Sequence, residues 1–140
     1  MYNHLLVPVD GSEQAYKALD QAIRLVKAIG SQISLSVLHV TGRVAISEPF
    51  IYFDLGQTLD DEENAVLAEA ANKLKDSGVT YNLLRADGDP AILICRTAQE
   101  RGCDLIVMGS RGVGLMSEIL LGSVSHAVSQ HSHCPVLLVK

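Results

Sequence analysis

Glycine and serine gather in one segment of the sequence, Gly109 to Ser125, in a pattern suited to holding phosphate. The segment begins with the run 109–112, Gly-Ser-Arg-Gly, and ends with the run 122–125, Gly-Ser-Val-Ser. Glycine has no Cβ, so its backbone amide can approach an anion closely, and serine hydroxyls add further donors. Where such a segment enters a helix, free N–H groups and the helix dipole also favour an anion. The pattern therefore predicts binding of a phosphorylated ligand.

Another glycine, Gly11, follows the first apolar run of the chain. His4 to Val9 reads as a short buried strand, and Asp10-Gly11-Ser12 closes it. In open parallel sheets, ligands bind beyond the carboxyl ends of the strands, at the point where the strand order reverses. If the strands before Gly11 and Gly109 are neighbours at that point, both loops face one crevice. A strand order of 3-2-1-4-5 would make them neighbours, but residue spacing alone leaves the order open.

Two interpretations of the segment from Gly109 to Ser125 stay open on the residues alone. It can cradle phosphate, or it can be a glycine turn followed by a serine that caps a helix and needs no ligand. Other glycine motifs fit less well: the sequence has no P-loop, and the run that starts at Gly112 lacks the third glycine of the dinucleotide fingerprint.

The elements that must position these loops alternate between strands and helices. Short apolar runs predict five strands, and the stretches between them carry apolar residues at helical spacing. The alternation predicts an α/β, Rossmann-like fold, in which an open parallel sheet has helices on both faces and residues 1–140 form a single domain. The predicted strands are His4–Val9, Ile33–Val40, Val79–Ala86, Asp104–Met108 and Pro135–Val139.

The helix boundaries follow from capping residues. Ser12 and Asp89, the latter followed by proline, are typical N-caps, and the last helix is expected from Ser123 to His131. Four acidic residues, 60–63, suit the positive end of the second helix. Residues 41–58 follow neither period, and we interpret them as a long loop whose aromatic side chains cap the core edge, with a binding loop as the alternative.

Composition narrows the class of protein. The formal net charge is −5, which argues against a general nucleic-acid binder because phosphate contacts need a basic face. No apolar stretch approaches the roughly 20 residues that span a bilayer, and we see no signal peptide. The three cysteines include no CxxC pair, so we expect reduced thiols in a cytoplasmic protein rather than disulfides or a zinc site.

Several blocks of the sequence, in order, resemble the ATP-binding branch of the universal stress protein family. The spacing G-x2-G-x9-G-[ST] is present as Gly109, Gly112, Gly122 and Ser123. The first strand and loop, 6–12, and the ending, 134–139, are also similar to that family, so the resemblance covers essentially the whole chain. It implies a five-stranded sheet of order 3-2-1-4-5, which supplies the strand adjacency that spacing leaves open.

The resemblance also implies a binding site for ATP. Asp10 would lie near the ribose and could help to hold a magnesium ion. Arg111 stands where some ATP-binding relatives carry histidine, and its guanidinium keeps a phosphate partner available. The residues implied at the adenine are Pro8, Val9, Val40 and Met108. Those implied around the ribose and phosphates are Gly109, Arg111, Gly112, Gly122, Ser123, Val124 and Ser125.

A means of cleaving ATP is harder to identify. Hydrolysis requires a positioned water and stabilised charge on the γ-phosphate, and the sequence offers phosphate holders without a convincing base. His126, His131 and His133 lack metal-ligand spacing, and we interpret them as a solvated helix end. His4 and His39 lie in or beside strands, where packed histidines are commoner than catalytic ones.

The functional prediction is a universal stress protein that binds ATP with no or very slow hydrolysis. One alternative is a slow, magnesium-dependent ATPase centred on Asp10. Another is a nucleotide-free interaction dimer in which the glycines serve only the fold. The resemblance implies a homodimer formed through the last strand, and Val136 to Val139 is an apolar strand that would invite pairing at an unprotected edge.

Overall fold

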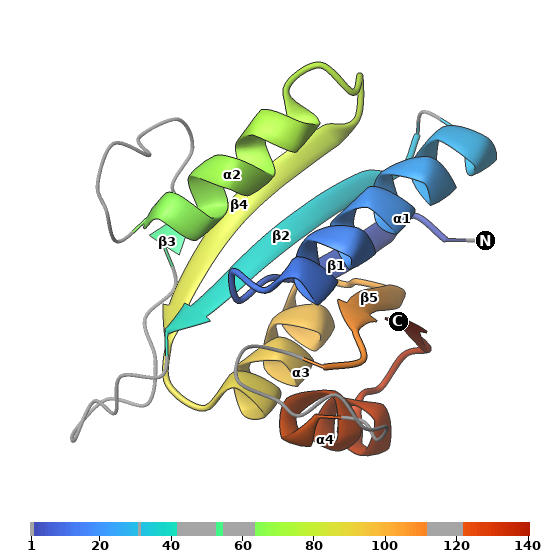
Figure 1. The fold of residues 1–140 in the computed structure, drawn as a ribbon. Helices are drawn as coiled ribbons and strands as arrows, with labels where there is room; N and C mark the ends of the chain where they lie inside the picture. Colours follow the sequence, from blue (N-terminus) through green and yellow to red (C-terminus); the bar gives the residue numbers. More distant parts are fainter. Residues whose placement is uncertain (1, 31, 42–52, 55–63, 112–121) are drawn as a thin grey trace.

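The fold is described from a computed structural model, which covers residues 2–30, 32–41, 53–54, 64–111 and 122–140 (Figure 1). The strands are β1 (His4–Pro8), β2 (Ser34–Thr41), β3 (Phe53–Asp54), β4 (Thr80–Asp87), β5 (Leu105–Gly109) and β6 (Val136–Val139). The helices are α1 (Glu13–Ile29), α2 (Ala65–Leu74), α3 (Pro90–Glu100) and α4 (Ser123–His131). None of these helices combines the length and apolar character that crossing a membrane requires.

The strands form one sheet of order β3-β4-β2-β1-β5-β6. Its five longer strands are parallel, and they confirm the predicted order 3-2-1-4-5 when numbered without β3. β1 therefore lies between β2 and β5, where the chain turns back to extend the sheet in the other direction. This is the switch point at which the loops after β1 and β5 meet.

The short strand β3 is a difference from the sequence prediction. It pairs antiparallel with β4 through Phe53 and Asp54, at two positions that we had assigned to a loop of residues 41–58. Thr41 also belongs to a strand, because β2 continues to it. A two-residue strand leaves no readable alternation in a sequence, so period-based analysis cannot detect it. The other residues of that predicted loop lie outside the described ranges.

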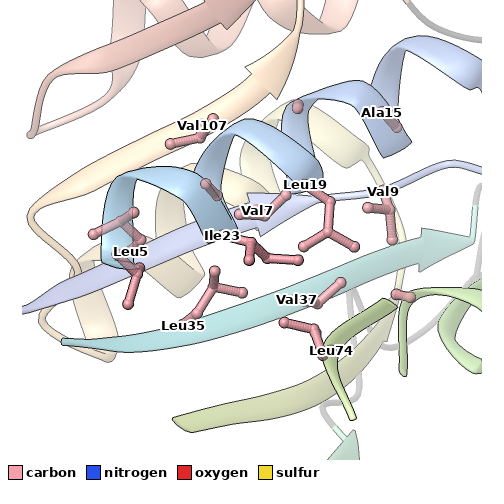
Figure 2. Close-up of a cluster of buried hydrophobic side chains, with 14 of the residues drawn as sticks. Leu5, Val7, Val9, Ala15, Leu19, Ile23, Leu35, Val37, Leu74 and Val107 are labelled. Carbon is pink, nitrogen blue, oxygen red and sulfur yellow. The ribbon is translucent and has the colours of Figure 1, made fainter. Parts of the chain in front are cut away.

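Alternating side chains of the strands build two cores, one on each face of the sheet. Leu5 and Val7 of β1 pack with α1 and α2 on one face, whereas Leu6 packs with α3 and α4 on the other. Figure 2 shows the first core, where Leu19 and Ile23 of α1 lie over β1 and β2. The near-continuous burial of β1 and β5 follows from this double cover, as is typical of parallel sheets.

Capping residues set the helix ends close to their predicted places. The Ser12 hydroxyl accepts the Ala15 N–H at 3.2 Å, and Asp89 caps α3 in the same way with Ile92 at 3.1 Å. Ile29, the last residue of α1, is 38% exposed. The acidic run 60–63 lies outside the described residues, and α2 begins after it.

Candidate functional site

A cavity of about 210 Å³ lies at the carboxyl ends of β1, β2 and β5. Every predicted site residue that the structure describes lines it, whereas Gly112 lies outside the described residues. The lining is Pro8, Val9, Asp10, Ala15, Leu38, Val40, Pro90, Ile94, Met108, Gly109, Arg111, Gly122, Ser123, Val124 and Ser125. The structure thus brings the two glycine loops together, as the predicted switch point requires.

Four lining residues were missed by sequence reasoning. Leu38 precedes Val40 by two positions, so strand alternation places both on one face and could have revealed it. Ala15 belongs to the first turn of α1, directly behind the Asp10 loop. Pro90 and Ile94 come from α3, which packs beside α4, and no local pattern in the sequence indicates that contact. Together with Met108, these residues give the cavity its apolar walls.

The start of α4 is fastened to the end of β5 by one buried carbonyl. The Ser110 carbonyl accepts the Gly122 N–H at 2.8 Å and the Ser125 hydroxyl at 2.7 Å. Ser110 is fixed in turn, because its own N–H donates to Val139 of β6 at 2.9 Å. Both serines are buried. This carbonyl therefore sets where the helix N-terminus stands beside the cavity.

The start of α4 differs in two ways from what the sequence predicts: in the residue that caps the helix and in the role of the Ser125 hydroxyl. Gly122 is the N-cap of α4 and Ser123 is its first residue, so the interpretation of a serine N-cap is wrong. The Ser125 hydroxyl lies 2.7 Å and 3.0 Å from two carbonyls, and it therefore donates within the protein rather than towards a ligand. The first helical hydrogen bond comes from the His126 N–H to the Gly122 carbonyl, so the N–H groups of residues 123–125, which line the cavity, have no acceptor within α4.

The loop after β1 is a tight turn built by Asp10 and Gly11. One Asp10 oxygen accepts the Ser12 N–H at 3.0 Å, although the side chain is otherwise exposed at the cavity rim. Gly11 has a φ of +87°, a conformation that other residues rarely adopt, and a Cβ there would lie 3.3 Å from Val66. The turn points the carboxylate towards the cavity.

Gly109 is required by packing, whatever the cavity binds. A Cβ on it would lie 3.0 Å from two atoms of Gln14, one of them a backbone carbon, and 3.1 Å from the Arg111 carbonyl. The first turn of α1 and the end of β5 therefore approach so closely that a side chain at this position would push one of them away. The glycine that first suggested an anion site therefore also holds the two loops together.

No histidine or cysteine is among the described residues that line the cavity. His126, His131 and His133 are exposed, as expected of a solvated helix end. Within the described ranges, no three histidine, cysteine, aspartate or glutamate side chains gather as metal ligands. Burial raises the pKa of Cys103 to about 12, so this thiol stays protonated near neutral pH.

Comparison with known sequences finds relatives along the whole chain. Residues 1–140 match the universal stress protein family. Universal stress protein YxiE of Bacillus subtilis is 42% identical over 151 residues, covering 100% of both chains. Universal stress protein MJ0531 of Methanocaldococcus jannaschii is 30% identical over 141 residues, covering 100% of this chain and 83% of that one.

Solved structures give the same result. Protein MJ0577, also of Methanocaldococcus jannaschii, superposes with a TM-score of 0.81 at 29% identity, covering 100% of this chain and 96% of that one. A universal stress protein in complex with cAMP superposes with a TM-score of 0.71 at 27% identity, covering 99% and 96%.

Replacing Ser125 should loosen the start of α4. Ser125→Ala removes one of the two donors to the Ser110 carbonyl, and we expect unfolding free energy to fall by about 1 kcal/mol. Ser129→Ala is the matched control, because that hydroxyl donates to a carbonyl within the same helix. Urea unfolding of both variants measures the difference, and equal losses would contradict the assigned role of Ser125.

Adding a single methyl group at Gly109 should also destabilise the protein. Gly109→Ala forces the first turn of α1 away from β5, and we expect a loss of about 1–3 kcal/mol from overpacking. The positive-φ glycines do not include Gly109, so backbone strain adds nothing to this cost. Thermal unfolding without ligand measures it, and a change within about 0.5 kcal/mol would show that the contact yields easily.

Proposed function

The chain belongs to the universal stress protein family, and from that premise we propose that its cavity binds an adenine nucleotide, with ATP as the working ligand. The protein would act in the cytoplasm as a stress-response component whose nucleotide occupancy, rather than turnover, carries the signal. The observation that carries this proposal is the convergence of the predicted site residues on one cavity at the switch point. The relative crystallised with cAMP supports an adenine nucleotide as the class of ligand.

The apolar half of the cavity suits a flat base. Leu38, Val40, Ile94 and Met108 present aliphatic and thioether surface from two strands and a helix. A purine that slides between such walls is removed from water on both faces, which favours its binding. Pro8 and Val9 close the cavity beside β1. We assign this half to the adenine.

The polar half suits ribose and phosphates. The first turn of α4, which follows Gly122, presents N–H groups and the positive end of the helix dipole, which attract an anion. The exposed hydroxyl of Ser123 and the Arg111 guanidinium add donors on the same side. Gly109 and Val124 contribute backbone at the lining. We assign this half to the phosphates, with Gly112 and the Ser125 N–H in the same cradle.

A magnesium ion fits the rim of this cavity. Asp10 presents a carboxylate there, and magnesium prefers oxygen ligands from one or two carboxylates together with nucleotide phosphates. The ion would neutralise phosphate charge when bound with ATP. Asp10 would hold it while keeping the turn after β1 through the Ser12 N–H.

The lining residues favour binding over hydrolysis. Among the described residues of the cavity wall, Asp10 and Arg111 are the ionisable ones, and one Asp10 oxygen is already engaged with backbone. Asp10 at the rim is nevertheless the observation that keeps a slow, magnesium-dependent ATPase as the second candidate. Magnesium-dependent phosphate release that Asp10→Ala abolishes would favour that candidate.

Adding a side chain at Gly122 tests whether phosphate binds at this position. Gly122→Val places two methyl groups where phosphate would lie, while its extended backbone, with φ of −66°, accepts any residue. Calorimetry should show ATP binding weakened at least tenfold, or about 1.4 kcal/mol. Adenosine serves as the control ligand, because it lacks phosphates and should bind the variant and the wild type equally.

Two calorimetric results would contradict these assignments. Equal ATP affinity of Gly122→Val and wild type would show that phosphate does not lie at this position. A wild type that binds no adenine nucleotide would leave the interaction dimer as the better description of the protein.

We further propose that two copies pair through β6. This strand ends the described sheet beyond β5, and its Leu137 side chain is 43% exposed. An apolar edge strand with unpaired backbone groups favours pairing with a second copy. Leu137→Lys should therefore convert a dimer to monomer in analytical ultracentrifugation. A wild type that sediments as a monomer at high concentration would contradict the pairing.

A further inference from the structure

The imidazole of His39 makes an unusual contact with the backbone of the neighbouring strand. Its Nδ1 lies 2.9 Å from the carbonyl oxygen of Val9, just after the end of β1. A carbonyl can only accept a hydrogen bond, so Nδ1 carries the proton and donates it. His39 is half-buried near the end of β2. Val9 itself and Val40, the residue after His39, both line the cavity.

The contact takes the place of the next backbone hydrogen bond, or rung, of the ladder between β1 and β2. The regular ladder extends to the Val9 N–H, which donates to Leu38 at 2.8 Å. In a parallel ladder alternate residues face the same neighbour, so the backbone of Val40 is directed towards β1, as that of Leu38 is. The next rung would join the Val40 N–H to the Val9 carbonyl. Among the backbone hydrogen bonds of the described residues this rung is not formed, and His39 holds the carbonyl instead.

The early end of the ladder changes what Val40 offers to the cavity. Its N–H and C=O point to the β1 side, at a level where β1 has already turned away as the Asp10 loop. Val40 lines the cavity, and a donor and an acceptor of one residue therefore lie side by side at its wall. Adenine presents the complementary pair, a ring nitrogen that accepts beside an amino group that donates. Guanine has a carbonyl in place of that amino group, so the same pair would mismatch it.

We propose that His39 is a positioning residue that ends the β1–β2 ladder one rung early and so reserves the Val40 backbone for reading adenine. The inference rests on the proposed function, since it names how that same cavity selects its base. Without the imidazole, the Val9 carbonyl would draw in the Val40 N–H and extend the ladder.

His39 acts through Val9 and not by touching the ligand. Side chains alternate along a strand, so His39 lies on the face of Val37, whereas Val40 lies on the face of Leu38. Figure 2 shows Val37 and Val9 beneath α1, in the core on the first face, and Leu38 belongs to the core on the other. The imidazole thus reaches the Val9 carbonyl from the side of the sheet opposite Leu38, Ile94 and Met108 of the cavity wall.

Two substitutions separate this role from a merely structural one. His39→Leu removes the donor, whereas His39→Asn keeps a side-chain N–H near the position of Nδ1. His4→Leu is the matched control, because His4 is also a half-buried strand histidine, bonded to Ser36 at 2.7 Å at the opposite end of the sheet. We expect His39→Leu to weaken ATP binding about tenfold and to reduce the preference for ATP over GTP. His39→Asn should restore most of both, and His4→Leu should change neither.

A measurement on nucleotide-free protein tests the ladder directly. Amide hydrogen exchange by NMR should show fast exchange at Val40 and slow exchange at Leu38 in the wild type. In His39→Leu, the Val40 amide should become at least tenfold better protected, and the nitrogen shifts of wild-type His39 should place the proton on Nδ1.

Different results would overturn different claims. A wild type that binds no adenine nucleotide contradicts the proposed function. A wild type that binds ATP while His39→Leu keeps the same affinity and base preference contradicts the role of His39. A Val40 amide that is equally protected in both proteins, or a proton on Nε2, also contradicts it, with or without nucleotide.

Discussion

The site depends on one buried acceptor, the carbonyl of Ser110. It receives the Gly122 N–H and the Ser125 hydroxyl, and so joins the end of β5 to the start of α4 across the segment between them. The N–H of the same residue binds Val139, which ties this junction to the edge strand β6. Because the helix dipole acts only within its first turn, the position of that turn decides where an anion can bind. The place of the proposed phosphate half of the cavity therefore follows from this single constraint.

The glycines near the cavity divide into two kinds. Gly11 and Gly109 are needed by the fold, the first for its positive φ and the second for its contact with Gln14. Gly122 has an ordinary backbone conformation at the helix N-cap and lines the cavity, so its conformation does not require glycine, and we propose that a ligand does. A glycine-rich pattern in the sequence does not distinguish these roles. The backbone conformation of Gly11 and the distances around Gly109 identify the roles of those two.

The sequence predicts the main strands and helices of the fold and most of the residues that line the cavity. Strand periodicity and the caps at Ser12 and Asp89 are local signals, and the structure reproduces them. The strand order came from family resemblance, since nothing local says which strands pair. The sequence does not predict that the Ser125 hydroxyl bonds to the carbonyl of Ser110, fifteen residues earlier in the chain. Nor does it predict that the His39 imidazole bonds to the carbonyl of Val9, which follows another strand.

The central claim is that the cavity between β1, β2, β5 and α4 holds adenine nucleotide. The most direct test is native mass spectrometry of the protein after purification without added nucleotide, repeated with equal concentrations of ATP and GTP. The account predicts a single nucleotide on each chain, with ATP taken in clear preference to GTP. A chain that stays bare, or that takes both nucleotides equally, would contradict it.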